Sequence, residues 1–481
     1  MKIEIDTQNK KQKYIDPTSW QNSTLRYAPP ADFPAFLAEH LGRAKIMRVF
    51  ITLDEYWDYR TDTYYPDYAI GTKRYRDSEL YYLYDWEAIV PAPSGICFVD
   101  YLRSHSQNAD ELMLNVRRLE REVSDGIITY DQYENVFEKA VEYCKDLAPN
   151  IRYVECCNEV DLKTFGNLTA QEYMNIYERA YHVIKRLNKK HRYPVPLEIG
   201  GWALAKPFIK WGLWEDFLRL LAASNLGEKP IDFYSMHYYN QACCEGLERF
   251  DMDKEARELC AVDKLKLWIG RHTSLIRELG LPECVIFCNE IGGTRCLGEP
   301  ASALKNASEV YSYLIASREK EFENFYMFPW CTFHNPKLQT SYTQFVREND
   351  GSYSATPNGM AVLMLHKIKG DILETKVSEC EGNDAGYRAL GVANGRSLYV
   401  ACTNPSESEE KIEMCIDGVE KGKYEIRQYL CDDVNNNCIT GRTHFPEPQA
   451  NYVVWQDCDK RLEISFDAKP YAFALYEIVR L

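Results

Sequence analysis

The order of apolar and polar residues divides this chain into two parts. Before about residue 370, short apolar runs rich in β-forming residues alternate with segments whose apolar residues recur every three or four positions. The later part instead contains runs in which apolar and polar residues alternate, separated by turn residues. The first pattern predicts strands that alternate with amphipathic helices, and the second predicts antiparallel strands. The chain is therefore expected to have an α/β part followed by an all-β part.

The first part fits a (β/α)8 TIM barrel over residues 14–369, with about 44 residues per strand and helix unit. We expect its strands near 18–20 and at 46–51, 111–116, 153–159, 196–202, 231–239, 285–293 and 324–330. We expect its helices at 30–43, 131–147, 214–224, 264–279, 301–322 and 358–368, with a further one starting at the capping box 169–172. If the strand that ends at Glu159 is the fourth, the one that ends at Glu290 is the seventh and that at Trp330 is the eighth.

The remaining segments lie outside the regular alternation. Residues 54–106 are rich in Tyr, Asp and Pro and are predicted to form a long functional loop that walls the pocket. Residues 370–481 are predicted to form an antiparallel β-sandwich, with strands at 396–401, 411–416, 424–429, 462–466 and 472–478. Residues 1–13 are expected to supply an N-terminal strand that joins the sandwich, followed by a linker at 9–13.

Two strands of the predicted barrel end in the same dipeptide. Asn158-Glu159 follows one β-rich run and Asn289-Glu290 follows another, three units later. Active sites of such barrels lie at the carboxyl ends of the strands. A lone strand-end Glu is more often a surface or capping carboxylate, but two in equivalent places predict a pair. Glycosidic bond cleavage needs one carboxyl that donates a proton and one that stays ionised.

Composition limits the partners. With 72 Asp and Glu against 57 Lys and Arg, the net charge of −15 argues against nucleic acid or an anionic membrane. Thirty-five Tyr and nine Trp include rings that could stack on sugars. The given chain shows no signal-peptide core and no apolar run long enough to span a membrane, so we expect a cytoplasmic location. Seventeen Cys without any Cys-x-x-Cys pair suit reduced thiols and predict neither a metal site nor a cofactor.

The stretch at 155–161, Glu-Cys-Cys-Asn-Glu-Val-Asp, resembles the Glu-x-Trp-Asn-Glu-Pro-Asp signature of clan A glycoside hydrolases. It is most similar to family 39, the β-xylosidase and α-L-iduronidase family. This resemblance implies that Glu159 is the general acid/base, that Asn158 binds the sugar 2-hydroxyl and that Glu290 is the nucleophile. The order of barrel and sandwich also fits, so the resemblance covers most of the chain.

The same resemblance assigns further residues to the substrate site. Residues 235–239 resemble the sixth-strand segment in which a His and a Tyr line the site, which implies His237 and Tyr239, or its neighbour Tyr238, beside the nucleophile. Trp330 would stack under the sugar, and Arg48 would pack against the nucleophile. For each of these residues a purely structural role stays open, as an interior histidine, a core tryptophan or a barrel ion-pair partner.

Three positions depart from the family pattern. Cys157 replaces the signature Trp, Val160 replaces Pro, and Phe50 stands where a His commonly follows the second-strand Arg. The catalytic pair is intact, so the departures bear on the identity of the sugar.

The expected function is a retaining exo-glycoside hydrolase that releases a terminal sugar, a β-xyloside first, from oligosaccharides or plant-type glycans by double displacement. Alternatives are β-galactosidase, α-L-arabinosidase or α-L-iduronidase specificity, or an inactive carbohydrate-binding barrel. A metal-dependent isomerase would need further acidic and His residues at strand ends. An iduronidase would need basic residues near the site, for which Lys206 and Arg295 are the candidates. A homo-oligomer is left open.

Overall fold

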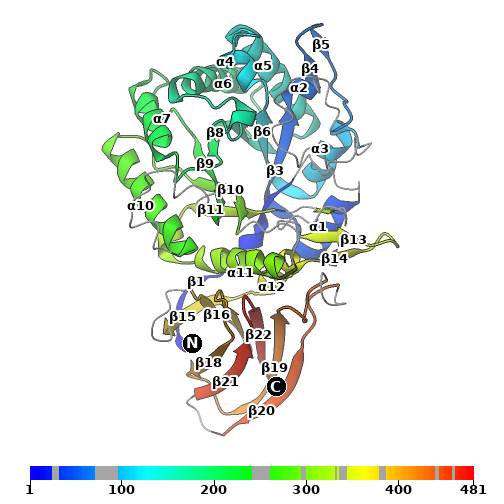
Figure 1. The fold of residues 1–481 in the computed structure, drawn as a ribbon, viewed down its shortest axis with the longest axis vertical. Helices are drawn as coiled ribbons and strands as arrows, with labels where there is room; N and C mark the ends of the chain where they lie inside the picture. Colours follow the sequence, from blue (N-terminus) through cyan, green and yellow to red (C-terminus); the bar gives the residue numbers. More distant parts are fainter. Residues whose placement is uncertain are drawn as a thin grey trace.

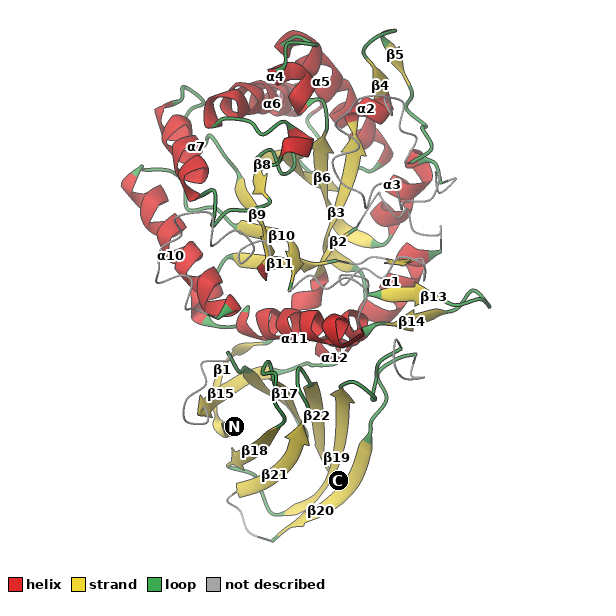
Figure 2. Cartoon of the chain, in the orientation of Figure 1, coloured by secondary structure: helices red, strands yellow, loops and turns green. Residues whose placement is uncertain are grey.

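The computed structural model describes residues 1–23, 32–70, 96–240, 260–293, 300–330, 333–334, 344–378, 386–438, 444–457 and 461–481. A barrel of strands ringed by helices forms one part, and a second part made of strands packs below α11 and α12 (Figures 1 and 2). The predicted fold class, a (β/α)8 barrel followed by a β-sandwich, is confirmed.

The barrel is an eight-stranded parallel sheet whose strands follow one another in chain order. A bridge between Asn22 and Trp330 joins its first and last strands and closes it. Its strands are β2 (Trp20–Asn22), β3 (Ala44–Thr52), β6 (Ala109–Arg117), β7 (Ile151–Cys156), β8 (Glu198–Leu204), β9 (Phe233–Tyr239), β10 (Ile286–Gly292) and β11 (Phe325–Pro329). The strand before Glu159 is therefore the fourth and the strand that holds Glu290 is the seventh, as the sequence predicts.

Helices surround this sheet, as Figure 2 shows in red. They are α1 (Phe33–Leu41), α3 (Phe98–Gln107), α4 (Glu120–Ser124), α5 (Tyr130–Leu147), α6 (Ala170–His191), α7 (Trp211–Ala223), α10 (Ala261–Glu278), α11 (Pro300–Ala316) and α12 (Pro357–His366). Capping boxes at Thr129 and Thr169 start α5 and α6, because each threonine accepts a backbone N–H that the first helical turn leaves free. None of the helices in the described ranges is long and apolar enough to cross a membrane.

The lower half of the barrel interior is apolar. It is filled by seven buried residues that each point inward from a strand: Trp20, Ile46, Met113, Tyr153, Phe233, Phe287 and Phe328. Side chains two positions further along a strand point the same way. Hence the next inward layer, toward the carboxyl ends of the strands, begins with Arg48, Asn115 and Glu155, which are all fully buried.

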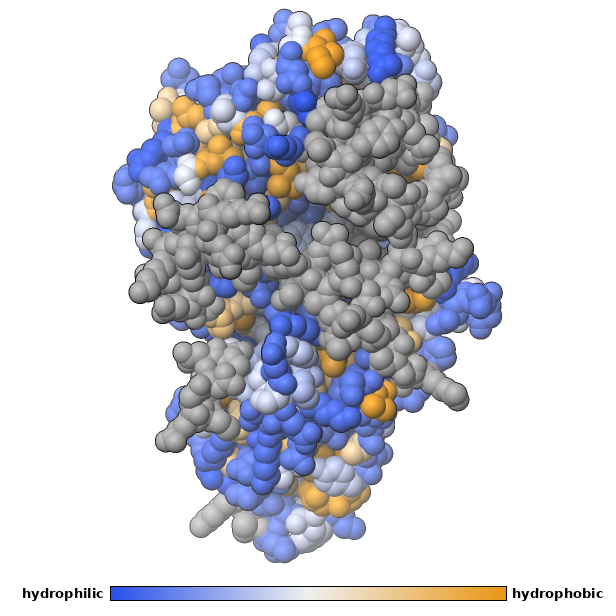
Figure 3. Space-filling model, in the orientation of Figure 1, coloured by the Kyte–Doolittle hydropathy of each residue, from blue (hydrophilic) through white to orange (hydrophobic). Residues whose placement is uncertain are grey.

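The second part is a nine-stranded sheet in the order β20-β19-β22-β17-β16-β15-β1-β18-β21, antiparallel except where β1 pairs with β18. Its strands are β1 (Lys2–Lys13), β15 (Asp371–Ser378), β16 (Ala389–Asn394), β17 (Ser397–Thr403), β18 (Glu410–Asp417), β19 (Gly422–Cys431), β20 (Ala450–Gln456), β21 (Arg461–Ala468) and β22 (Phe473–Arg480). Helix α12 is buried along its length, and one hydrophobic cluster runs from the barrel helices into these strands. The barrel and the sandwich therefore share an apolar interface. Hydrophilic residues predominate on the described surface seen in Figure 3.

Several local predictions were wrong. The segment predicted as a linker at 9–13 continues strand β1, and the predicted loop at 54–106 contains the hairpin β4 (Trp57–Asp58) and β5 (Thr63–Tyr64) and most of α3. It begins within the short helix α2 (Leu53–Tyr56), whereas residues 71–95 lie outside the described residues. Strands β15, β16 and β20 were not predicted. Neither was the small sheet of β12 (Phe333–His334), β13 (Phe345–Arg347) and β14 (Tyr353–Ala355).

Candidate active site

The loop after β7 places Glu159 over the carboxyl end of the barrel. Its backbone is left-handed at Cys157 and at Glu159, with φ of 69° and 50°, which is uncommon outside glycine and typical of functional sites. The N–H of Glu159 donates to the carbonyl of Ala203, at 2.9 Å. Asp161 accepts hydrogen bonds from the N–H groups of Ala205 and Lys206, each at 3.0 Å. The loop is thus fastened to the end of β8.

Glu290 lies inside β10 and is turned toward the same place. The register of β10 against β9 shifts between Cys288 and Glu290, where an extra residue is accommodated. Such a bulge re-aims the following side chain. The neighbouring Asn289 donates to the buried Glu155, and Glu290 reaches the side chains of β9 and β3.

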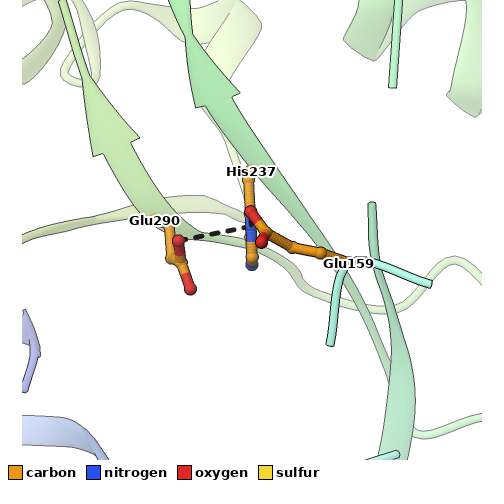
Figure 4. Close-up of side chains that lie close together, drawn as sticks. All are labelled: Glu159, His237 and Glu290. Carbon is orange, nitrogen blue, oxygen red and sulfur yellow. Dashed lines mark hydrogen bonds and ion pairs between the residues drawn. The ribbon is translucent and has the colours of Figure 1, made fainter. Parts of the chain in front are cut away.

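Three side chains from different elements meet at the centre of the site. His237, on β9, lies between the two carboxylates (Figure 4). Its Nδ1 is 3.0 Å from Oε1 of Glu159 and 3.4 Å from Oε2 of Glu290. One carboxylate oxygen of Glu159 and one of Glu290 lie within 4.8 Å of each other. The structure therefore brings the two strand-end carboxylates together, as the sequence predicts.

Arg48 joins the nucleophile candidate to a second buried carboxylate. Its Nη1 donates to Oε1 of Glu290 at 2.7 Å, and its Nε and Nη2 donate to Oε2 of Glu155 at 2.9 and 2.6 Å. Asn115 adds a hydrogen bond to the same Oε2, at 2.6 Å, and Asn289 bonds the other oxygen. Every strong acceptor of Glu155 is used, which is how a protein compensates for burying a charge.

The surroundings of Glu290 favour its ionised form. Burial by itself would raise the pKa, but the charges of His237 and Arg48, with the hydrogen bonds from Arg48 and Tyr239, lower it. The hydroxyl of Tyr239 donates to Oε2 of Glu290 at 2.7 Å. Nε1 of Trp330 donates in turn to the Tyr239 oxygen at 2.8 Å. This places Tyr239 beside Glu290, whereas the hydroxyl of Tyr238 donates to the carbonyl of Ala261.

The pKa of His237 is shifted in the opposite direction to that of Glu290. Burial by itself would lower its pKa, but Glu290 and Glu159 outweigh that effect and raise it. The raised pKa favours the charged imidazole, which attracts both carboxylates. Nε2 of His237 is buried and has no hydrogen-bond partner in the described residues.

Asn158 lies beside the pair with one end of its amide occupied. Its Oδ1 accepts from Nη2 of Arg48 at 2.8 Å. Among the described residues, nothing accepts a hydrogen bond from its Nδ2. This nitrogen is free to donate to a ligand hydroxyl.

Three site residues escaped the sequence reasoning. Glu155 stood in the quoted signature but was given no role, although it lies two positions after Tyr153 in the same strand and so points to the same side, into the barrel. Asp161, also in the signature, anchors the loop that carries Glu159, and burial raises its pKa to about 6. Arg117 ends β6 beside the site, and nothing in its sequence context marks it.

Of the two basic residues that an iduronidase would need near the site, the structure describes one. Lys206 follows β8 and is half-buried, and its backbone N–H is engaged with Asp161. Arg295 lies outside the described residues.

Glu159, His237 and Glu290 form a group that could hold a metal ion, judged by the spacing of their ligand atoms. The distances of 3.0 and 3.4 Å from Nδ1 to the carboxylates are those of hydrogen bonds and ion pairs. A proton on Nδ1 accounts for this arrangement.

No protein-family model matches the chain, and no curated protein matches it either.

Comparison of the structure finds glycoside hydrolases. A family 39 enzyme from Xanthomonas axonopodis pv. citri matches with a TM-score of 0.65 at 13% identity, over 100% of this chain and 97% of that one. A monomeric β-xylosidase from Caulobacter crescentus matches with a TM-score of 0.58 at 12% identity, over 100% and 99%. A bacterial orthologue of human α-L-iduronidase matches with a TM-score of 0.61 at 14% identity, over 100% and 84%. The chain therefore has the barrel-and-sandwich fold of these clan A glycoside hydrolases along its whole length.

Proposed function

We propose that this protein is a retaining glycoside hydrolase, with Glu290 as the nucleophile and Glu159 as the general acid/base. One observation carries the proposal, namely that carboxylate oxygens of these two residues approach within 4.8 Å at the carboxyl ends of the fourth and seventh strands. Retaining enzymes hold their carboxyl groups about 5–5.5 Å apart, whereas inverting enzymes leave about 6.5–9.5 Å for a water. The short separation supports direct attack by a carboxylate.

In the first step, Glu290 attacks the anomeric carbon and Glu159 protonates the departing oxygen. The glycosidic C–O bond breaks while an ester bond to Glu290 forms. The lowered pKa of Glu290 keeps it ionised for this attack, since Arg48, His237 and Tyr239 all stabilise its charge. In the second step, Glu159 removes a proton from water, which attacks the same carbon and releases the sugar with its original configuration.

The surrounding residues would bind and position the sugar. Asn158 presents its free Nδ2 for the 2-hydroxyl, and Trp330 is half-buried, so that part of its ring stays accessible for stacking. Arg48 and Tyr239 act as positioning residues, because each holds one oxygen of Glu290.

The proposal includes removal of a terminal sugar, with a β-xyloside as first choice. The β-xylosidase among the similar structures supports this choice, and the iduronidase orthologue keeps an acidic sugar as the second candidate. Analysis of the products from long oligosaccharides tests the exo mode. Internal cleavage would exclude it.

Turnover of nitrophenyl glycosides tests the catalytic assignment. The panel covers pentosides, hexosides and uronides of both anomers, with wild type, Glu290→Ala and Glu159→Ala, each with and without azide. We expect Glu290→Ala to be inactive on the cleaved glycoside and to yield, with azide, a glycosyl azide of inverted configuration. Glu159→Ala should give the azide of retained configuration from the activated substrate. The matched control is Glu198→Ala, at the opposite end of the barrel on β8, which should keep wild-type turnover.

Two results would overturn the assignment. Full activity of Glu290→Ala would remove it from the reaction, and a first product of inverted configuration from wild type would exclude double displacement. Silence across the panel and on oligosaccharides would instead support a binding barrel.

A further inference from the structure

Arg117 is the last residue of β6 and faces the catalytic centre. It pairs in register with Thr52 of β3, and Asn115, two positions earlier on β6, reaches Glu155 inside the barrel. Alternation along a strand therefore directs Arg117 to the same side as Asn115 and one layer closer to the carboxyl ends of the strands. Its guanidinium carbon lies 4.5 Å from the centre of the Phe50 ring.

The same ring carries a second arginine, and the two guanidinium groups differ in their partners. The guanidinium carbon of Arg48 lies 4.6 Å from the Phe50 centroid, and its nitrogens donate to Glu155, Glu290 and Asn158. Arg117 donates to none of these three residues. Its Nε is buried without a hydrogen-bond partner, and it makes no ion pair with a carboxylate of the described residues.

An arginine in this state is unusual. Arg117 as a whole is half-buried, and its Nε is the buried donor. Guanidinium groups remain charged at neutral pH, and a buried donor of a charged group without an acceptor is costly to fold. Burial, followed by the charge of Arg118, lowers the pKa of Arg117, while Glu290 and Glu55 act in the opposite direction without pairing with it. The cation is thus partly stripped of water and kept beside the reacting carboxylates with its donors unused. An acceptor from outside the chain would complete its hydrogen bonds.

We propose that Arg117 binds the carboxylate of a uronic acid residue of the substrate, held in or next to the sugar subsite formed by Glu159 and Glu290. The proposal rests on the glycosidase function proposed above and names its substrate class. The planar fork of a guanidinium matches a carboxylate with two parallel hydrogen bonds. A neutral sugar would leave Nε of Arg117 without an acceptor and its charge without a counter-charge. The site therefore discriminates between a uronic acid and a neutral sugar.

The test compares an acidic oligosaccharide with its carboxyl-reduced counterpart, which differs only in the charged group. Nitrophenyl uronides and the matching neutral hexosides provide the same comparison on small substrates. The variants are Arg117→Met and Arg117→Lys. The control is Arg152→Met, which removes the same charge at the amino end of β7, where Arg152 pairs with Glu111 and Glu198.

Wild type should prefer the acidic oligosaccharide to its carboxyl-reduced form. A preference for the nitrophenyl uronide as well would place the uronic acid in the cleaved subsite, in place of the β-xyloside proposed above. Arg117→Met should lose about 10- to 100-fold in kcat/KM on the acidic member, the factor that a charged hydrogen bond supplies, and change less than about threefold on the neutral one. Arg117→Lys should keep part of the preference, because it retains the charge without the fork. Arg152→Met should behave like wild type on both members.

Thermal unfolding separates recognition from a structural role. Arg117→Met should unfold at or above the wild-type temperature, because the change removes an unpaired cation and leaves no acceptor without its donor. Equal losses on the acidic and neutral members, or a marked drop in unfolding temperature, would overturn the proposal. Preference for a sulfated sugar over the uronide would overturn the assignment to a carboxylate.

Binding to an inactive variant keeps this test independent of turnover. Calorimetric titration of Glu290→Ala with the acidic oligosaccharide and its reduced form should show a difference in affinity that disappears in Glu290→Ala with Arg117→Met. If wild type cleaves nothing and this difference is still seen, the anion site stands and the hydrolase function fails. If glycosides are cleaved without any charge preference, the hydrolase function stands and the anion site fails.

Discussion

Replacing Tyr239 by Phe removes the hydrogen bond from its hydroxyl to the nucleophile candidate, and with it the acceptor of Nε1 of Trp330. The hydroxyl donates to Oε2 of Glu290 at 2.7 Å, and the ring is otherwise unchanged by the substitution. Hydrogen bonds to charged groups contribute about 1.5–3 kcal/mol, and one pKa unit corresponds to about 1.4 kcal/mol. Because the bond stabilises the ionised carboxylate, its loss should raise the pKa of Glu290 by about one to two units.

The direction of the effect on activity follows from the proposed role of Glu290 as the nucleophile. The nucleophile must be ionised, so kcat/KM falls as the pH drops through its pKa. In wild type this acidic limb should lie below 4.5, the ordinary value for a glutamate, because the surroundings lower the pKa. In Tyr239→Phe the limb should move to higher pH by about one to two units.

The assay is a pH profile of kcat/KM on the best nitrophenyl glycoside, with each sample stopped in base before the nitrophenolate is read. Tyr238→Phe is the matched control, since it removes a hydroxyl from the neighbouring residue, where the partner is the carbonyl of Ala261. Thermal unfolding of both variants at neutral pH checks that the folds are intact. An acidic limb that stays in place in Tyr239→Phe would refute the reasoning, as would an equal movement in Tyr238→Phe.

Four further outcomes are expected. Glu155→Gln should lower the free energy of unfolding by about 3–5 kcal/mol in a denaturant titration, because it removes one of the two buried carboxylates that pair with Arg48; a loss below about 1 kcal/mol would contradict this. Asp161→Asn should remove a pH-dependent part of the stability. The raised pKa, about 6 against 3.8, makes wild type gain up to about 3 kcal/mol over the variant as the pH falls from 6 to 4, and parallel stability curves would contradict it. Dialysis against EDTA should leave turnover unchanged, whereas a loss restored by a divalent ion would place a metal among Glu159, His237 and Glu290. A chain ending at residue 369 should be insoluble, because it exposes the apolar side of α12 that the sandwich strands cover; a soluble and active product would show the barrel to be independent.

The sequence predicted the barrel because its strands and helices differ in period. Apolar runs of parallel strands and the three-to-four spacing of helices are both strong signals, and they located the fourth and seventh strands correctly. Strand β20 gave no such signal, because Tyr452, Val453 and Trp455 are consecutive or nearly so and all exposed at the edge of the sheet. Helix α3 was missed because the loop predicted from the Tyr- and Pro-rich composition was taken as far as residue 106, over most of the helix.

The pair of carboxylates was predictable from the sequence, but the pairing of the arginines around it was not. Glu159 and Glu290 repeat one dipeptide at two strand ends, and repetition is visible in a sequence. Arg48 and Arg117 look alike in the sequence, since each lies in an apolar β-rich run. Only the fold shows that one is neutralised by Glu155 and Glu290 while the other has no acceptor among the described residues. Pairing across strands depends on register, which local patterns do not encode.

The three carboxylates of the centre differ in partners and in exposure, and this difference supports separate roles for them. The Glu155 side chain is fully buried and saturated with hydrogen bonds, so it can only balance the charge of Arg48. The Glu290 side chain is 7% exposed and is held by Arg48 and Tyr239, which suits a group that must stay ionised and aimed at one atom. The Glu159 side chain is 17% exposed and contacts only His237 among the described polar side chains. Of the three, it is the one that can exchange a proton with water between the two steps, as an acid that becomes a base must do. With the proton on Glu159 and a charge on His237, Arg48 and His237 balance Glu155 and Glu290, and the positive charge of Arg117 is left unbalanced. A protonated Glu159 is the state that the first step of a retaining hydrolysis requires.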